Sequence, residues 1–240
     1  MYDDYCGQTS WAPTAAYDRF YSWIDVAPGS YVLDIACGAG GPALRLAHGT
    51  GCALVGIDLN PQAIATATAL ADERGLGVRV RFARHDAAQP LPFPDQAFDA
   101  VVCVDALMGL PDRPRIFAEW ARVLKPSGRL VFTDPVLTGP LSNAELAARS
   151  PFSFVLTPPG YNERLLEEAG FELLRREDVT ADLAEMARRY GASRAAHADA
   201  LRALEGDEVF AGQNQYRATA EPLARERRLS HVAFLARKPA

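Results

Sequence analysis

Short apolar runs alternate with helix-forming segments through the first half of this 240-residue chain. Five of the runs have the length and composition of buried strands, and they cover residues 31–36, 53–57, 78–83, 98–104 and 129–133. Three of the intervening segments have the apolar spacing of helices, and they cover residues 41–48, 62–74 and 112–124. Strands that alternate with helices pair in parallel and are covered on both faces, so the pattern predicts an α/β doubly wound fold.

The second half of the chain continues this pattern less regularly. Residues 136–160 are rich in proline and predict an irregular connection around one short helix. Residues 171–179 and 229–235 have the character of two further strands, and the 181–226 segment between them is helical in character. We therefore expect a seven-stranded, mostly parallel sheet with a helical lid inserted between its last two strands.

The same pattern assigns different tasks to parts of one domain over residues 1–240. Residues 1–29 are rich in aromatic side chains and include a helix over 14–24. They predict a cover over a pocket, and a helix packed on the edge of the core is the alternative. Residues 30–135 form the regular core of the sheet. The remainder, 136–240, holds the more variable segments, which in folds of this type select the substrate.

Composition and charge exclude several classes of function. A net charge of −5 argues against a nucleic-acid-binding face, and no run approaches the roughly 18 apolar residues of a membrane span. The first residues are acidic and lack the apolar segment of a secretory signal. The four cysteines form no C-x-x-C pair and the four histidines share no metal-ligand spacing. We expect a cytoplasmic monomer or homodimer that handles a small molecule without a metal, nucleic acid or membrane.

A glycine cluster follows the first predicted strand in the segment VLDIACGAGGPALRLA, residues 32–47. Gly38, Gly40 and Ala43 match the pattern G-x-G-x-x-A, which places backbone N–H groups and a helix N-terminus against a ligand. Asp58 lies 20 residues after Gly38, the spacing of an acidic residue that binds a ribose. Taken alone, this pattern fits a nicotinamide dinucleotide.

Asp34 argues against that dinucleotide. It lies four residues before Gly38, at the entrance to the glycine loop, where its charge would repel a pyrophosphate at a cost of about several kcal/mol. The same carboxylate suits a cationic ligand without phosphate. S-adenosylmethionine is such a ligand, because it carries a ribose, an ammonium group and a sulfonium.

With these residues the chain resembles the class I S-adenosylmethionine-dependent methyltransferases, in particular the small-molecule branch that includes the ubiquinone/menaquinone and sarcosine/dimethylglycine methyltransferases. The matching segments are VLDIACGAGGPALRLA, VGIDLNPQAIATA, VRFARHDAAQPLPFPDQAFDAVVCVDAL, PDRPRIFAEWARVLKPSGRLVFTDP and AGFELL. They cover about residues 30–135 well and the remainder loosely. The resemblance implies a Rossmann-like methyltransferase fold and methyl transfer to a metabolite or natural product, at nitrogen, oxygen or carbon.

The resemblance also implies roles for individual residues around the cofactor. The methionine part would contact Asp34, Gly38 and Gly40, and the ribose hydroxyls would contact Asp58. The adenine would contact Leu59, Asp86 and the backbone of Ala87. Val104 and Asp105 would line the methyl-transfer edge.

Two positions depart from the family pattern. Ala36 replaces the usual first glycine of the loop, which a negative φ would allow. Gly109 stands where relatives often carry histidine after the fourth strand, and it should leave that wall of the pocket more open.

The acceptor side is less defined by the sequence. Asp105 is the candidate group for orienting or deprotonating the substrate, and a purely structural polar end to a buried strand is the alternative. Tyr17, Tyr21 and Met108 are candidate substrate contacts, and aromatic walls would suit a flat or cationic acceptor. Two other functions stay open: a cofactor-binding protein of this fold with another or no activity, and an NAD-dependent oxidoreductase.

Overall fold

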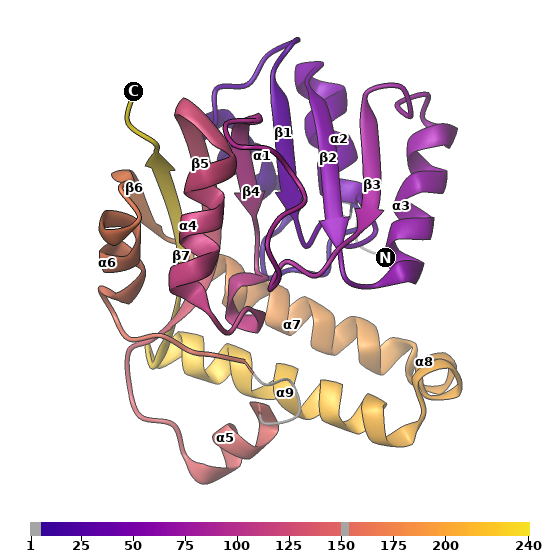
Figure 1. The fold of residues 1–240 in the computed structure, drawn as a ribbon. Coiled ribbons are helices and arrows are strands. Elements are labelled where there is room, and N and C mark those ends of the chain that lie inside the picture. Colours follow the sequence, from indigo (N-terminus) through magenta and orange to yellow (C-terminus); the bar gives the residue numbers. More distant parts are fainter. Residues whose placement is uncertain (1–5, 150–153) are drawn as a thin grey trace.

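The computed structural model describes residues 6–149 and 154–240, and its centre is one seven-stranded sheet (Figure 1). Residues 1–5 of the predicted cover and 150–153 of the predicted connection lie outside the described residues. The strands are β1 (Tyr31–Ile35), β2 (Ala53–Asp58), β3 (Val80–Arg84), β4 (Phe98–Cys103), β5 (Leu124–Leu137), β6 (Glu172–Asp178) and β7 (Leu229–Arg237). Their order is β3-β2-β1-β4-β5-β7-β6, and only β7 runs antiparallel to its neighbours. This confirms the predicted seven-stranded, mostly parallel sheet.

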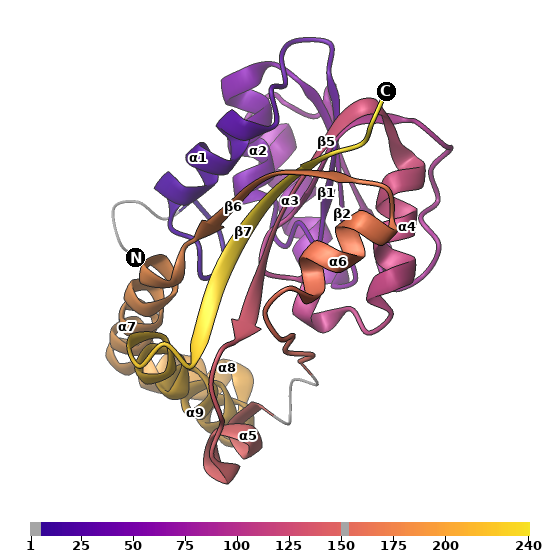
Figure 2. The same cartoon turned by 90° about the vertical axis from the view of Figure 1, so that its left-hand side faces the viewer.

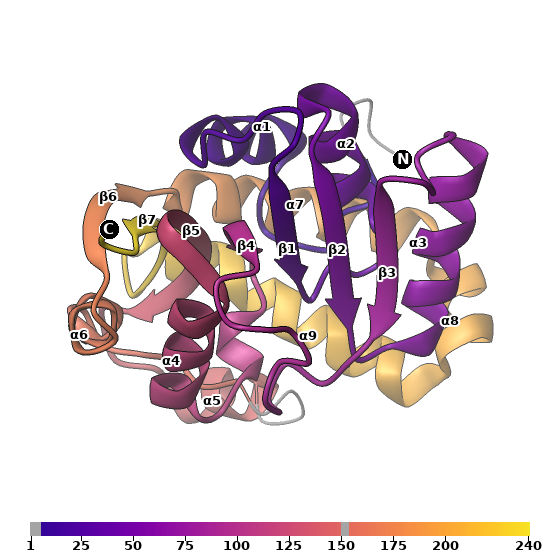
Figure 3. The same ribbon diagram turned by 45° about the horizontal axis from the view of Figure 1, so that its top comes forward.

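Helices cover both faces of the sheet. One face carries α1 (Thr14–Trp23), α2 (Gly41–Thr50) and α3 (Pro61–Glu73), and the other carries α4 (Arg113–Val123) and α6 (Tyr161–Glu168). Successive side chains of a strand point to opposite faces, so Val32 and Val102 pack with α1 and α2 while Leu33 and Val101 pack with α4. Figure 3 shows α1 and α2 on one side of β1 and β2 and α4 on the other.

The predicted helical insertion lies between β6 and β7, as the sequence pattern indicates. It consists of α7 (Thr180–Ala196), α8 (Ala198–Glu205) and α9 (Asp207–Arg225), and α7 packs against α9 around a separate apolar core. These helices extend across the carboxyl ends of the parallel strands (Figure 1). Figure 2 shows β7 leaving this bundle to enter the sheet between β5 and β6. Two shorter elements follow β4 and β5, the 3-10 turn η1 (Leu107–Gly109) and α5 (Asn143–Arg149), which packs on α9.

The predicted start of the fifth strand was wrong. The sequence pattern begins this strand at residue 129, but β5 already begins at Leu124 and takes up the extra residues as a register shift against β4. Ser127 adopts a left-handed φ of 63° there, and its N–H donates to the carbonyl of Lys238. The chain beyond β7 therefore completes the hydrogen bonding of this segment, through a contact between residues far apart in sequence.

A buried ion pair joins α4 to the sheet. Arg113 at the start of α4 binds Asp134 of β5 through two hydrogen bonds, of 2.6 Å and 3.1 Å, with both side chains essentially inaccessible to solvent. Asn162 of α6 and Thr157 donate to the same carboxylate at 2.8 Å and 3.1 Å. Nothing in the local pattern around Arg113 predicts this partner, which lies 21 residues away.

Candidate cofactor and acceptor site

The carboxyl ends of β1, β2 and β4 meet at a cavity of about 210 Å³. This is the edge at which open α/β sheets bind ligands. The sheet and its loops contribute Ala36, Cys37, Gly38, Pro42, Asp58, Val104, Asp105 and Ala106. The N-terminal strap, which we define as residues 7–11, and α1 complete the wall with Gly7, Gln8, Thr9, Ser10 and Tyr17.

The glycine loop orients the carboxylate of Asp58. Gly38 donates its N–H to Asp58 Oδ2 at 2.9 Å, and Asn60 donates its N–H to Oδ1 at 2.8 Å. Gly40 has a φ of 78°, and a Cβ there would lie 2.7 Å from the Cβ of Ala67, so the tight turn requires glycine. The carboxylate is therefore held by backbone groups at the cavity wall.

Asp34, at the end of β1, is a buried carboxyl group that lacks a counter-ion. It is 7% exposed, and its side chain makes no hydrogen bond with residues 6–149 or 154–240. Burial, together with the nearby charge of Asp58, raises the pKa of Asp34 to about 8. A cationic group bound beside it would favour the ionised form, which fits the ammonium group of S-adenosylmethionine.

Ala36 does not have the negative φ that would allow alanine in place of glycine without strain. Its φ is +57°, in the left-handed region that costs a non-glycine residue about 1–2 kcal/mol. The close packing of the loop against β2 imposes this conformation, since the N–H of Cys37 donates to the carbonyl of Ile57.

Ala36→Gly should therefore stabilise the protein by about 0.5–1 kcal/mol, because the relieved strain exceeds the greater chain entropy of glycine in the unfolded state. Urea unfolding followed by circular dichroism measures the change. Ala39→Gly in the same loop is the matched control, because Ala39 has no positive φ and should gain nothing. A loss of stability in Ala36→Gly would contradict the argument.

Asp105, after β4, forms the centre of a buried hydrogen-bond network. Its Oδ1 accepts from Thr133 Oγ1 at 2.6 Å and lies 2.5 Å from His231 Nε2, and its Oδ2 accepts from the N–H of Trp11 at 2.5 Å. Burial alone would raise the pKa of Asp105, but the charge and hydrogen bonds of these partners outweigh it and lower the pKa. The carboxylate thereby holds the N-terminal strap against the sheet.

A second cavity, of about 290 Å³, adjoins the first beneath α7 and α9. The two cavities share Thr9, Ser10, Asp105 and Ala106. The other walls of the second cavity are Trp11, Met108, Gly109, Phe154, Tyr190, Gln213, Tyr216 and Arg217. The arrangement provides two binding spaces that meet at the strap and at the end of β4.

The structure brings most of the predicted residues to these cavities. Ala36, Gly38, Asp58, Val104, Asp105 and Tyr17 line the first, and Met108 and Gly109 line the second. Six predicted residues line neither cavity: Tyr21, Asp34, Gly40, Leu59, Asp86 and Ala87. Of these, Tyr21 is buried and Leu59 is 58% exposed. Asp86 instead accepts from the N–H of Ala88 at 2.9 Å.

Sequence reasoning missed the strap residues and the residues of α7 and α9 that line the second cavity. The strap has no apolar period, and its position depends on the contact between Trp11 and Asp105. Tyr190 of α7 and Arg217 of α9 lie in helices whose residue pattern does not distinguish cavity-facing positions from core or solvent positions. The aromatic enrichment of the N-terminal segment was the one signal available.

No group of three or more His, Cys, Asp or Glu side chains in the described part of the chain is arranged to hold a metal ion. Within the same residues, no helix combines the length and apolar character that crossing a bilayer demands.

The fold and the site define a Rossmann-like protein of the methyltransferase class, with a glycine loop and two strand-end carboxylates at the ligand-binding edge. A family model described as a methyltransferase domain matches residues 33–132. The 27-O-demethylrifamycin SV methyltransferase of Amycolatopsis mediterranei is 31% identical over 99% of this chain and 88% of that protein. The chain belongs to this methyltransferase family, in agreement with the resemblance found in its motifs.

Other relatives match a smaller part of their own length. Methyltransferase GfsG of Streptomyces halstedii is 34% identical over 68% of this chain, and sterol 24-C-methyltransferase ERG6B of Gibberella zeae is 32% identical over 66%. The chain spans 60% and 43% of these two proteins.

Solved structures match over nearly the whole chain. The [4+2]-cyclase SpnF has a TM-score of 0.82 at 31% identity, covering 98% of this chain and 84% of its own. A putative sarcosine dimethylglycine methyltransferase from Galdieria sulphuraria has a TM-score of 0.83 at 21% identity, covering 94% and 82%, which shows the shared fold.

Proposed function

We propose that this chain transfers a methyl group from S-adenosylmethionine to a small-molecule acceptor. The observation that carries the proposal is the pair of adjoining cavities, one beside the glycine loop and one under the helical insertion, which share Ser10, Asp105 and Ala106. A cofactor in the first cavity and an acceptor in the second would meet at this shared wall. Family membership supports the same reaction.

The cofactor roles follow the strand ends. Asp34 would pair with the ammonium group, with Gly38 and Gly40 shaping the loop around the methionine part, and Asp58 would accept from the ribose hydroxyls. The adenine would be bound by Leu59, Asp86 and the N–H of Ala87. When bound, S-adenosylmethionine supplies a methyl carbon made electrophilic by the adjacent sulfonium, and the protein supplies alignment.

The acceptor side is formed by segments outside the sheet core. We infer that residues 1–29 cover the site, that 30–135 bind the cofactor and that 136–240 select the acceptor. Tyr17 and Met108 lie where they can contact bound molecules, whereas Tyr21 would act through packing. The cytoplasmic location and the monomeric or homodimeric state stay predictions from composition.

Asp105 is better suited to orienting than to proton removal. Both of its oxygens already accept hydrogen bonds, and its lowered pKa makes it a weak base. We propose that it positions Trp11 at the acceptor cavity, so that methyl transfer depends on alignment of an acceptor that loses its own proton readily.

The affinity for S-adenosylmethionine should fall as pH is lowered, by about tenfold per unit well below pH 8. The raised pKa of Asp34, about 8, leaves it protonated there in the ligand-free protein, whereas an ammonium group binds the ionised form. Binding should therefore release a proton, which calorimetry in buffers of different ionisation enthalpy measures. Asp34→Asn should remove the proton release. Equal affinity at about pH 5.5 and about pH 7.5 would contradict the assignment.

The reaction itself is tested by incubating the protein with methyl-labelled S-adenosylmethionine and panels of amines, phenols and acids. Transfer of label with formation of S-adenosylhomocysteine is the expected result. Calorimetric titration with S-adenosylmethionine, S-adenosylhomocysteine and NADH tests the cofactor, and binding of NADH alone would overturn the proposal.

A cyclase is the second candidate function, because a solved structure of 31% identity is the [4+2]-cyclase SpnF. The two candidates differ in one measurable respect, since methyl transfer consumes S-adenosylmethionine and cyclisation does not. Tight cofactor binding without label transfer to any acceptor in the panel would favour the second candidate.

A further inference from the structure

The second cavity is walled by a connected set of aromatic rings. Trp11 of the strap lies 5.8 Å from Tyr190 of α7 and 5.9 Å from Tyr216 of α9, between ring centroids, and Phe154 lies 5.4 Å from Tyr216. These flat, apolar faces suit an acceptor with a ring-bearing or extended apolar frame.

Arg217 of α9 places a positive charge in this aromatic wall. Its Nη1 binds the side chain and carbonyl of Gln213, while its Nε is buried without a hydrogen-bond partner and its Nη2 bonds to no residue that the structure describes. It forms no ion pair within residues 6–149 and 154–240. The acidic neighbour Glu205 is bound to Arg194 at 2.7 Å. The guanidinium therefore lines the cavity without a neutralising carboxylate.

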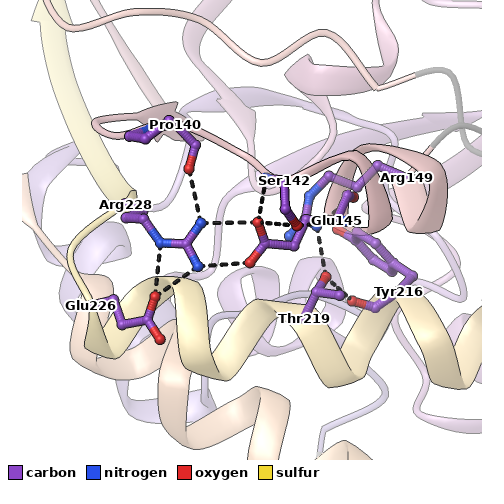
Figure 4. Close-up of polar contacts among 8 residues, drawn as sticks. All are labelled: Pro140, Ser142, Glu145, Arg149, Tyr216, Thr219, Glu226 and Arg228. Atoms are coloured by element: carbon purple, nitrogen blue, oxygen red, sulfur yellow. Dashed lines mark hydrogen bonds and ion pairs between the residues drawn. The ribbon is translucent and has the colours of Figure 1, made fainter.

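A second cation lies near one ring of the aromatic wall. The guanidinium of Arg149 lies 5.6 Å from the ring centre of Tyr216, and Figure 4 shows its hydrogen bond to Thr219, of 2.6 Å. Glu145, on the same helix, does not neutralise it, because the carboxylate binds Arg228 at 2.7 Å and 2.9 Å (Figure 4). Arg149 is 6% exposed, so its positive field is weakly screened by solvent.

The carboxylate at this cavity already has hydrogen-bond partners. Among the described lining residues, Asp105 is the one carboxylate, and its oxygens lie within hydrogen-bond distance of His231 Nε2, Thr133 Oγ1 and the N–H of Trp11. A cationic amine acceptor would thus meet an unpaired Arg217 and gain no free carboxylate, whereas an anionic oxygen would neutralise the guanidinium.

We propose that the acceptor carries an anionic oxygen group, a carboxylate or an ionised hydroxyl, on an apolar ring-bearing frame, and that Arg217 binds this group. That the bound molecule is a methyl acceptor rests on the proposed function. The preference of the cavity for an anionic ligand can be measured without methyl transfer. Arg217 would bind the anionic oxygen at the end of the cavity formed by α9. This contact would orient the acceptor, with the strap and Asp105 at the other end of the cavity.

Three probes that share one frame test the inference: 2-naphthoate, 2-naphthalenemethanol and 2-naphthylmethylammonium. Each is titrated calorimetrically into the full chain saturated with S-adenosylhomocysteine. The carboxylate should bind about tenfold more tightly than the alcohol, and the ammonium most weakly, because a hydrogen bond between a guanidinium and an anionic oxygen is stronger than one to a neutral hydroxyl. R217Q should abolish the carboxylate preference while leaving affinity for the alcohol unchanged, and R217K should retain part of it.

R225Q is the matched control, because Arg225 lies on the same helix, is 68% exposed and pairs with Glu221 outside this cavity. It should keep the full preference. Retained binding of the alcohol by R217Q establishes that the variant is folded. Equal binding of carboxylate and alcohol by the wild type, tighter binding of the ammonium, no binding of the carboxylate, or an undiminished preference in R217Q would each overturn the inference. Failure to bind S-adenosylhomocysteine would instead reject the proposed function, and the same probes would still report on Arg217.

Discussion

Asp58→Ala should lower the affinity for S-adenosylmethionine by about a hundredfold or more. The carboxylate lies at the end of β2 and is aimed by the N–H groups of Gly38 and Asn60, at 2.9 Å and 2.8 Å. Two charge-assisted hydrogen bonds to ribose hydroxyls, each contributing about 1.5–3 kcal/mol, are lost in the variant. Calorimetric titration with S-adenosylmethionine measures the loss.

The loop itself also depends on Asp58, so a structural effect must be separated from lost ligand contacts. Asp58→Asn keeps the shape and one oxygen acceptor, and it should retain more affinity than alanine. Asp95→Ala, an exposed carboxylate paired with Arg122 far from the cavity, should bind the cofactor like the wild type. An unchanged affinity in Asp58→Ala would mean that the ribose is bound elsewhere.

Arg113→Ala should destabilise the folded protein by about 3–5 kcal/mol. The substitution leaves the fully buried carboxylate of Asp134 without its ion pair, and desolvated charges without partners are costly. It also removes the hydrogen bonds from Arg113 to Asn162, of 3.0 Å, and to the carbonyl of Val155, of 2.8 Å. Urea unfolding followed by circular dichroism gives the change in the free energy of unfolding.

Two comparisons separate burial from charge pairing as the cause. Lys125→Ala breaks an exposed pair with Asp99, of 2.8 Å, and should cost less than about 1 kcal/mol because solvent screens it. Arg113→Met combined with Asp134→Leu should recover much of the loss, since well-packed apolar side chains replace a buried pair at little cost. A loss in Arg113→Ala as small as that in Lys125→Ala would contradict the account.

The elements that the sequence predicted well are those whose signals are local. Turn residues, caps and apolar periods within a few positions mark these elements. They are the glycine loop, the strands on either side of it and the helices that begin at Pro61 and Arg113. Asn60 illustrates this, because its side chain caps α3 by accepting from the N–H of Gln62 at 2.9 Å. The prediction for the start of β5 was wrong for the opposite reason. The hydrogen bonding of that segment is completed by Lys238, which is distant in the sequence.

The site followed the same division. Asp34 and Asp58 were predicted as cofactor contacts because carboxylates at strand ends meet at one edge of a parallel sheet. The strained φ of Ala36 could not be read from its sequence, because the packing of the loop against β2 imposes it. Asp105 lies at the junction of the two cavities, and its partners Trp11 and His231 are 94 and 126 residues away in the sequence.

The sequence by itself determined the doubly wound sheet, the cofactor edge and the kind of cofactor, because each depends on residue type and short spacing along one strand–loop–helix unit. Only the tertiary structure decided which charges remain unpaired at the second cavity. Arg194 and Arg217 both lie in the helical insertion, yet Arg194 binds Glu205 whereas Arg217 lines the cavity. Ionic pairing and desolvation depend on distances across the fold, which residue types and spacing do not specify.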